Sequence, residues 1–141
     1  MASIGARSEY AEMINQLAGQ SVSDAPFKSF MHLFVACAAL AIQKKNKHAP
    51  MQTADIGQSV QDRIWRSNPE LERIIYAVAF YDTKDQRIFN DSDKCYGIFQ
   101  QYVNGGLEEL HVIYSDDRDS KNTYQKLLIE MAHVSLSNID Q

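Results

Sequence analysis

The chain has 141 residues, of which 45% are hydrophobic and 23% are charged, and its formal net charge is −4. This mixture is typical of a globular domain and excludes a disordered chain. The length predicts one domain, residues 1–141, with a core large enough to fold without disulfides.

Neither a signal peptide nor a membrane span is expected. The first residues lack a basic segment followed by an apolar run. The most apolar stretch, Phe27 to Ile42, is shorter than the roughly 20 residues that a span requires, and polar residues interrupt it. Cys37 and Cys95 lie far apart and form no CxxC motif. These features predict a reduced, cytoplasmic protein.

Apolar residues at helical spacing predict the elements of the first half of the chain. A helix is expected from about Ala6 to Ala18, ended by Gly19. A second, central helix is expected from the Ser23–Pro26 start signal to about Lys45. A loop at 46–58 and a short helix at 59–66 should follow.

The second half of the chain also follows a helical period. Asn68-Pro69-Glu70 predicts the start of a helix that extends to about Thr83. Asp91 or Ser92 should cap a helix that continues to Tyr114, and the last helix should begin at Asp119 or Ser120. Only a few residues near 87–89 resemble a strand. We therefore expect an all-α fold, a compact bundle of five to six helices with short loops.

The segment Phe99–Leu110, FQQYVNGGLEEL, resembles a motif of the fourth family of proteins associated with bacterial DNA phosphorothioation (Dnd) systems. Phe30–Lys45 is similar to the family's helix of small apolar residues that ends in a basic cluster. The resemblance covers roughly Phe27–Leu128, and the chain departs from it at Ala38–Ala41 and in a more polar loop around Gln52–Gln58. It implies an accessory component of a phage-defence island that modifies DNA or reads modified DNA, and it implies no catalytic residue.

Basic residues are concentrated in one part of this acidic chain. Residues 27–66 carry six basic and two acidic side chains, whereas residues 67–141 carry seven and thirteen. Several cations on one surface are what phosphate binding requires. The candidate nucleic-acid-binding residues are Lys44, Lys45, Lys47, Arg63 and Arg66. The alternative is a solvated helix end that the helix dipole favours.

Two kinds of residue are candidates for partner binding. Trp65, between two arginines, can stack on a base or a partner, although a single tryptophan more often lies in a core. Gly105 and Gly106 lie inside a predicted helix, where they cost about 2 kcal/mol relative to alanine. Close packing or a kink explains such a pair, and so does the close approach of a partner backbone.

Two ExxH motifs, Glu108–His111 and Glu130–His133, have the spacing of di-metal sites in helical bundles. The remaining ligands would have to be Glu9 or Glu12 and Glu70 or Glu72. Because the two motifs fall on consecutive helices, their order differs from that of ferritin-like proteins. We therefore predict no bound metal.

The sequence predicts a non-enzymatic accessory protein of a DNA-modification-linked antiviral defence system, without a cofactor. It would bind DNA, modified or not, or other defence-system proteins, and self-association is left open. No cysteine–histidine pair close in sequence and no GxSxG motif indicates nucleophilic catalysis. Two alternatives remain: an adaptor without DNA contact that uses Trp65, Tyr81 and Phe89, and a metal-dependent helical enzyme that uses the ExxH pairs.

Overall fold

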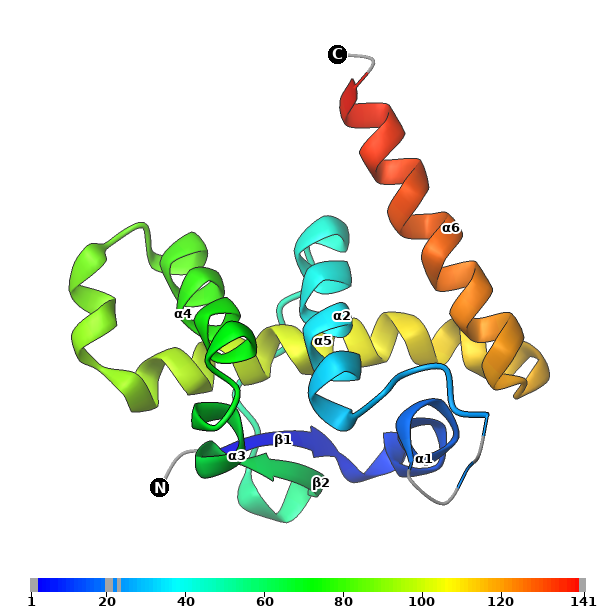
Figure 1. Ribbon diagram of the computed structural model, residues 1–141, viewed down its shortest axis with the longest axis horizontal. Coiled ribbons are helices and arrows are strands. Elements are labelled where there is room, and N and C mark those ends of the chain that lie inside the picture. The colour runs from blue at the N-terminus through cyan, green and yellow to red at the C-terminus, as the bar shows by residue number, and fades with distance from the viewer. Residues whose placement is uncertain (1–2, 20–21, 23, 140–141) are drawn as a thin grey trace.

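The computed structural model describes residues 3–19, 22 and 24–139, with side chains described as far as residue 132. This part of the chain forms six α-helices and one two-stranded sheet (Figure 1), so the predicted mostly helical fold is confirmed. The elements are β1 (Ser3–Arg7), α1 (Ala11–Ala18), α2 (Phe30–Lys44), β2 (Ile56–Gln61), α3 (Asp62–Arg66), α4 (Pro69–Thr83), α5 (Ser92–Asp117) and α6 (Ser120–Ile139). Short 3₁₀ turns occupy Ser8–Tyr10, Thr53–Asp55 and Gln86–Asn90.

Helix α5 is the long axis of the molecule. It has 26 residues, and α4, α2 and α6 follow one another along it (Figure 1). The strand β1 packs against it as well. Its middle is buried from Tyr102 to Leu107, so the core surrounds α5 rather than α2, the helix that the sequence predicts as central. No helix within the described residues is long and apolar enough to cross a membrane.

Polar side chains fix where the helices begin. The Ser29 hydroxyl accepts from the His32 amide at the start of α2, and Asp91 accepts from the Lys94 amide at the start of α5. Asp119 accepts from two amides of the first turn of α6. The start of α2 was predicted too early, since Ser29 is its cap and the chain before it forms bends. Ser23, part of the predicted start signal, lies outside the described residues.

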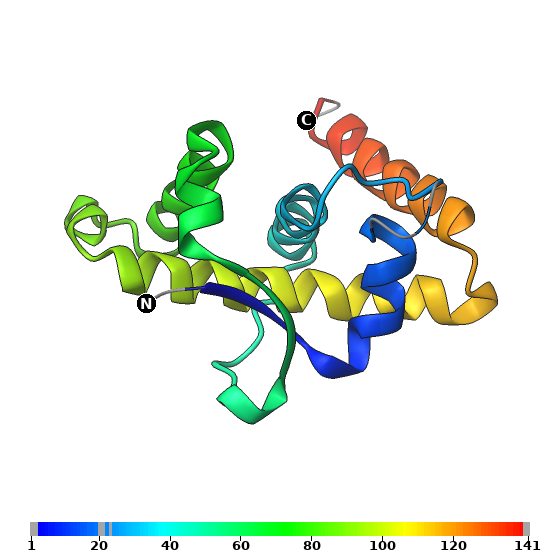
Figure 2. The same ribbon diagram turned by 60° about the horizontal axis from the view of Figure 1, so that its bottom comes forward.

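The two strands were not predicted. β1 occupies the residues just before the predicted first helix and the first two residues of that helix, and β2 spans the predicted loop and short helix. They pair antiparallel, with Ser3 opposite Gln61, Ile4 opposite Val60 and Gly5 opposite Ser59 (Figure 2). Their sequences, SIGAR and IGQSVQ, show no clear period of two in hydrophobic residues, although the burial of β2 does alternate. The residues near 87–89 lie in a 3₁₀ turn rather than a strand.

Candidate functional site

The first residues of the segment Phe99–Leu110, which carries the family resemblance, form hydrogen bonds with β1. Two amide side chains of α5 bond the main chain of this strand: the Gly5 amide donates to Gln100 Oε1 at 2.7 Å, and the Arg7 amide donates to Asn104 Oδ1 at 2.9 Å. Asn104 Nδ2 donates to the Gly5 carbonyl at 2.8 Å. Asn104 is fully buried, and its bond to the Gly5 carbonyl forms out of reach of water. Asn104 is therefore a structural residue.

Gly105 and Gly106 allow the main chain of α2 and of the loop after it to pass very close to α5. A Cβ atom on Gly106 would lie 1.8 Å from the Cys37 carbonyl oxygen of α2, and one on Gly105 would lie 1.7 Å from the Asn46 carbonyl oxygen. Both contacts are with main-chain atoms, which cannot rotate away. The helix continues through the pair, and both glycines are buried. Close packing explains them, and the alternative role in partner binding is corrected because no partner can reach them.

The loop after α2 forms hydrogen bonds with the same part of α5. Asn46 Nδ2 donates to the Gly105 carbonyl and to the Glu108 and Glu109 carboxylates, each at 3.2 Å. The His48 amide donates to the Gln101 carbonyl, and Gln101 Nε2 returns a bond to the His48 carbonyl. We call Gln100–Glu109 the docking segment, since it joins β1, α2 and this loop to α5.

The predicted basic cluster does not form one surface. Lys44 pairs with Glu130 at 2.7 Å, Lys47 with Asp82 at 3.0 Å and Arg66 with Asp62 at 2.8 Å. Arg63 lies beside the first residues of α2, whereas Lys44 and Lys45 are at its other end. A 15-residue helix spans about 22 Å. The structure therefore separates the two groups of cations and partly neutralises both.

Lys47 belongs to a network that ties the loop to α4 and α5. Its ammonium lies 5.8 Å from the centre of the Tyr102 ring, and the Tyr102 hydroxyl donates to Asp82 at 2.7 Å. Burial raises the pKa of Asp82, but the bonds from Tyr102 and Lys47 outweigh it, so the pKa lies below its ordinary value. The same carboxylate and burial raise the pKa of Tyr102.

This network predicts a pH-dependent contribution to stability. A carboxyl group with a lowered pKa stabilises the folded state above its ordinary pKa, and the contribution is lost as the pH falls through the folded-state value. We expect Asp82→Ala to lower the free energy of unfolding above about pH 4, with a difference from wild type that shrinks in more acidic solution. Urea unfolding of both proteins between pH 2 and 7 measures it. A difference that grows as the pH falls would contradict the assignment.

Trp65 is a core residue. Its side chain is 0% exposed, and its ring meets the Phe99 ring edge-on at 5.6 Å. The expectation that it stacks on a base or a partner is therefore corrected. The flanking arginines indicated an exposed position, but the short helix α3 directs its single aromatic side chain inward.

The residues considered for a metal site are dispersed. Glu108 bonds Asn46, Glu130 pairs with Lys44, and Glu72 accepts from Tyr96, about three turns of α5 away from Glu108. The side chain of His133 lies outside the described part of the chain. Both cysteines are buried, and burial raises the pKa of each thiol, which disfavours the nucleophilic thiolate.

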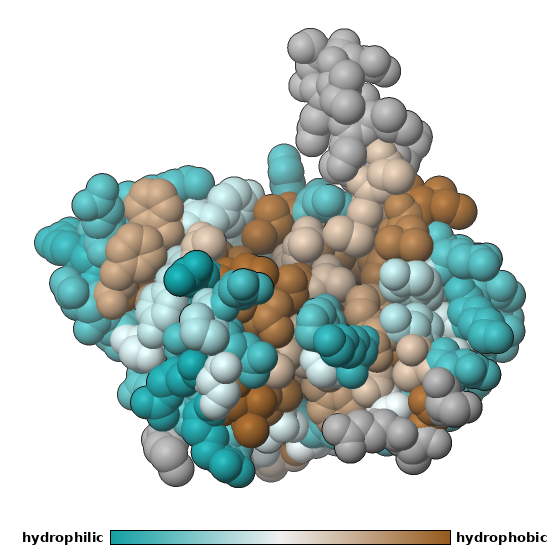
Figure 3. Space-filling view, in the orientation of Figure 1, coloured by the Kyte–Doolittle hydropathy of each residue, from teal (hydrophilic) through white to brown (hydrophobic). Residues whose placement is uncertain are grey.

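Large apolar side chains are exposed over α4 and the 3₁₀ turn after it (Figure 3), and others are exposed on α5 and α6. Phe80, Tyr81 and Phe89, here called the aromatic patch, are 37%, 45% and 48% exposed. The rings of Phe80 and Phe89 stack at 5.8 Å. Sequence reasoning found Tyr81 and Phe89 but missed Phe80, although it falls outside the buried stripe of α4 that contains Ile75, Val78 and Ala79.

A second exposed surface is basic. Lys28, His32 and Arg73, together with one acidic residue, Glu70, line a hollow of about 530 Å³ between the beginnings of α2 and α4. Within the described residues, neither Lys28 nor Arg73 forms an ion pair. Arg63, also without a carboxylate partner, lies on the other side of the same α2 turn. Lys28 and Arg73 were not predicted as binding residues, because they lie outside any cluster of basic residues in the sequence.

The geometry defines a small, mostly helical protein organised by a docking segment on its longest helix. The chain matches the family described as DNA sulphur modification system-associated protein 4 over residues 4–140 and belongs to that family. The resemblance is thereby confirmed, as is the association with a DNA sulphur modification system. No curated protein and no solved structure matches the chain.

Proposed function

We propose that the protein is a non-catalytic accessory component of its DNA sulphur modification system, that it works in the cytoplasm in antiviral defence, and that it acts by binding another protein of that system. The aromatic patch carries this proposal. Phe80 and Phe89 expose stacked rings, Tyr81 follows Phe80 on the same helix, and clustered exposed apolar side chains mark sites of protein contact. Aromatic residues are also the side chains that contribute most at interfaces.

The patch is already ordered in the free protein. Phe89 contacts both the Phe80 ring and the Tyr76 ring, at 5.8 and 6.4 Å between ring centres. The Lys84 ammonium lies 4.3 Å from the centre of the Tyr81 ring. Side chains that are held in place before binding lose little rotamer entropy when a partner arrives. The rings thus form a preorganised surface.

Replacing the two stacked rings should abolish most of the binding without unfolding the protein. We expect Phe80→Ser/Phe89→Ser to weaken the affinity for the partner at least about tenfold, because the interface loses its two adjacent anchors. Co-expression with the other proteins of the system, pull-down and titration of the captured protein measure it.

Val112→Ser is the matched control, since Val112 is 66% exposed and lies on α5, outside the patch. It should leave the affinity unchanged. Equal affinity of the double variant and the wild type would place the interface elsewhere, and capture of none of the system's proteins would contradict the proposal as a whole.

DNA binding is a second candidate, favoured by the unpaired cations around the first turn of α2. We expect Lys28→Gln/Arg63→Gln/Arg73→Gln to weaken binding to duplex DNA and to reduce the slope of log affinity against log salt by about 3. Lys44→Gln/Lys47→Gln should change it much less, because those cations are already paired.

Shift assays over a salt series, with duplexes that do and do not carry phosphorothioate linkages, measure these effects. Absent or salt-insensitive binding would exclude this candidate. A larger loss in the Lys44/Lys47 variant would restore the interface that the sequence predicted.

A further inference from the structure

The two edges of the small sheet differ in their hydrogen bonding. The outer edge of β1 is closed by α5, because Gly5 donates to Gln100 and accepts from Asn104. Both polar main-chain groups of Gly5 therefore point away from β2. In an antiparallel ladder, such a residue belongs to a non-hydrogen-bonded pair, and its partner also turns both groups outward. The partner of Gly5 is Ser59.

It follows that Ser59 presents its N–H and C=O on the outer edge of β2. Gln61, two residues further on and opposite Ser3, presents its N–H on the same edge. Within the described part of the chain, no hydrogen bond occupies these three groups. Both residues are exposed. The strand, IGQSVQ, also lacks the charges and prolines that commonly protect an edge from pairing.

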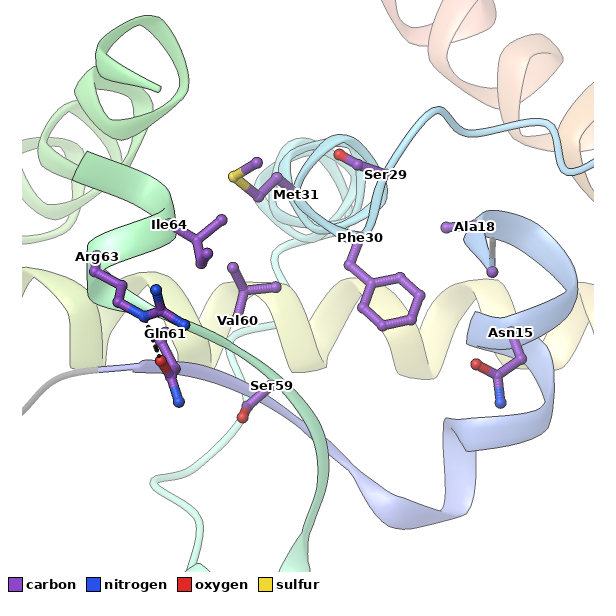
Figure 4. Close-up of a pocket in the computed structure, with 11 residues that line it drawn as sticks. Asn15, Ala18, Ser29, Phe30, Met31, Ser59, Val60, Gln61, Arg63 and Ile64 are labelled. Atoms are coloured by element: carbon purple, nitrogen blue, oxygen red, sulfur yellow. Dashed lines mark hydrogen bonds between the residues drawn. The ribbon is translucent and has the colours of Figure 1, made fainter. Parts of the chain in front are cut away.

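A hollow of about 610 Å³ runs beside this free edge. It lies between β2 and the end of α1, with the first turn of α2 behind it, and the Phe30 ring stands in its middle (Figure 4). Its apolar walls come from Ala18, Phe30, Met31, Val60 and Ile64. An open row of main-chain groups beside an apolar hollow is the arrangement by which a sheet accepts an extended peptide as an additional strand.

The charge at this hollow indicates an acidic ligand. Arg63 lines it, and its Nε donates to Gln61, which leaves the terminal guanidinium nitrogens available. The N-terminal turn of α2 adds partial positive charge and contains no acidic residue. A carboxylate on the added strand would meet both. Main-chain pairing favours a polypeptide over a nucleic acid here, because only a peptide backbone repeats the N–H and C=O groups.

The geometry points to strand addition: an extended, acidic segment of a partner protein from the same system pairs with β2 at Ser59 and Gln61 and places a side chain against Phe30. This inference rests on the proposed adaptor function and adds to it a second contact, separate from the aromatic patch.

The test uses the full-length protein and overlapping 12-residue peptides that cover the other proteins of the system. Fluorescence polarisation should find at least one acidic peptide that binds. Ser59→Pro, which removes the outward N–H on an edge where proline is tolerated, should weaken it at least about tenfold. Ser59→Ala keeps that N–H and should bind within about twofold of wild type. Arg63→Gln should weaken acidic peptides more than their amide counterparts.

N-methylation along the bound peptide gives a second readout. Methyl groups at alternate residues should abolish binding, while those between them should not, because a strand directs alternate N–H groups to its partner. Binding without this alternation, equal binding by Ser59→Pro, or no bound peptide would overturn the inference. The hollow would be assigned to nucleic acid instead if duplex DNA displaced the peptide, and if peptide binding depended on Arg63 but not on N-methylation.

The two proposals fail in different ways. If full-length partners are captured and depend on the aromatic patch but not on Ser59, the adaptor function stands and strand addition is wrong. If no protein of the system is captured by the full-length chain and no peptide binds, both are wrong.

Discussion

Gly106→Ala is expected to destabilise the protein by about 3 kcal/mol or more. The new methyl group would lie 1.8 Å from the Cys37 carbonyl oxygen and 2.7 Å from its Cα, so α2 must move away from α5 to admit it. Overpacking of a core costs about 1–3 kcal/mol when side chains can adjust, and here the obstructing atoms are main chain. The higher helix propensity of alanine stabilises the folded protein by only about 1 kcal/mol. Thermal and urea unfolding measure the loss.

Gly97→Ala is the control on the same helix. Gly97 is exposed, and a Cβ atom there would meet nothing within 4 Å. We expect this substitution to stabilise the protein by about 0.5–1 kcal/mol, since only the propensity changes. A neutral effect of Gly106→Ala would show that α2 does not cross α5 at this point.

Asn104→Ala should lower the free energy of unfolding by about 3 kcal/mol. The substitution leaves the Gly5 carbonyl and the Arg7 amide without the partners that close the outer edge of β1. A buried polar group without its hydrogen bond costs about 1–3 kcal/mol, and two groups lose theirs here. Amide exchange of Arg7 should accelerate together with the loss of unfolding free energy.

Gln101→Ala provides the comparison, because its side chain also bonds the main chain from α5. Its partner, the His48 carbonyl, lies at a half-exposed residue, so water can replace the lost donor. We expect Gln101→Ala to lower the free energy of unfolding by about 1 kcal/mol or less. Equal costs for the two amides would contradict the role of Asn104 as the buried clamp of the sheet.

The elements that were predicted well depend on local signals. Pro69 and its neighbours marked the start of α4, Asp91 that of α5 and Asp119 that of α6. The strands were missed because their stabilisation is not local. β1 pairs with residues about fifty positions or more away and takes its other bonds from Gln100 and Asn104. The pattern of five residues in the sequence cannot indicate these distant partners.

The candidate site was only partly predictable for the same reason. Sequence alone identified Gly105-Gly106 as unusual, and the structure supplied the crossing main chain that explains the pair. The basic residues at 44–47 are adjacent in sequence, but Glu130 and Asp82, which neutralise two of them, come from distant helices. Among the described residues, no carboxylate pairs with Arg63 or Lys28. Tyr81 and Phe89 were named as exposed aromatic residues, and both are about half exposed.

We propose that the docking segment organises the fold while partners bind the outer surface. Hydrogen exchange of the full-length protein, alone and with the captured partner, tests it most directly. We expect the slowest exchange at Val103–Leu107 in the free protein, because this part of α5 is buried. Protection on binding should be confined to the outer surface around Phe80–Phe89 and the edge of β2. Rapid exchange at Val103–Leu107 that the partner suppresses would contradict the claim and make the docking segment itself the binding site.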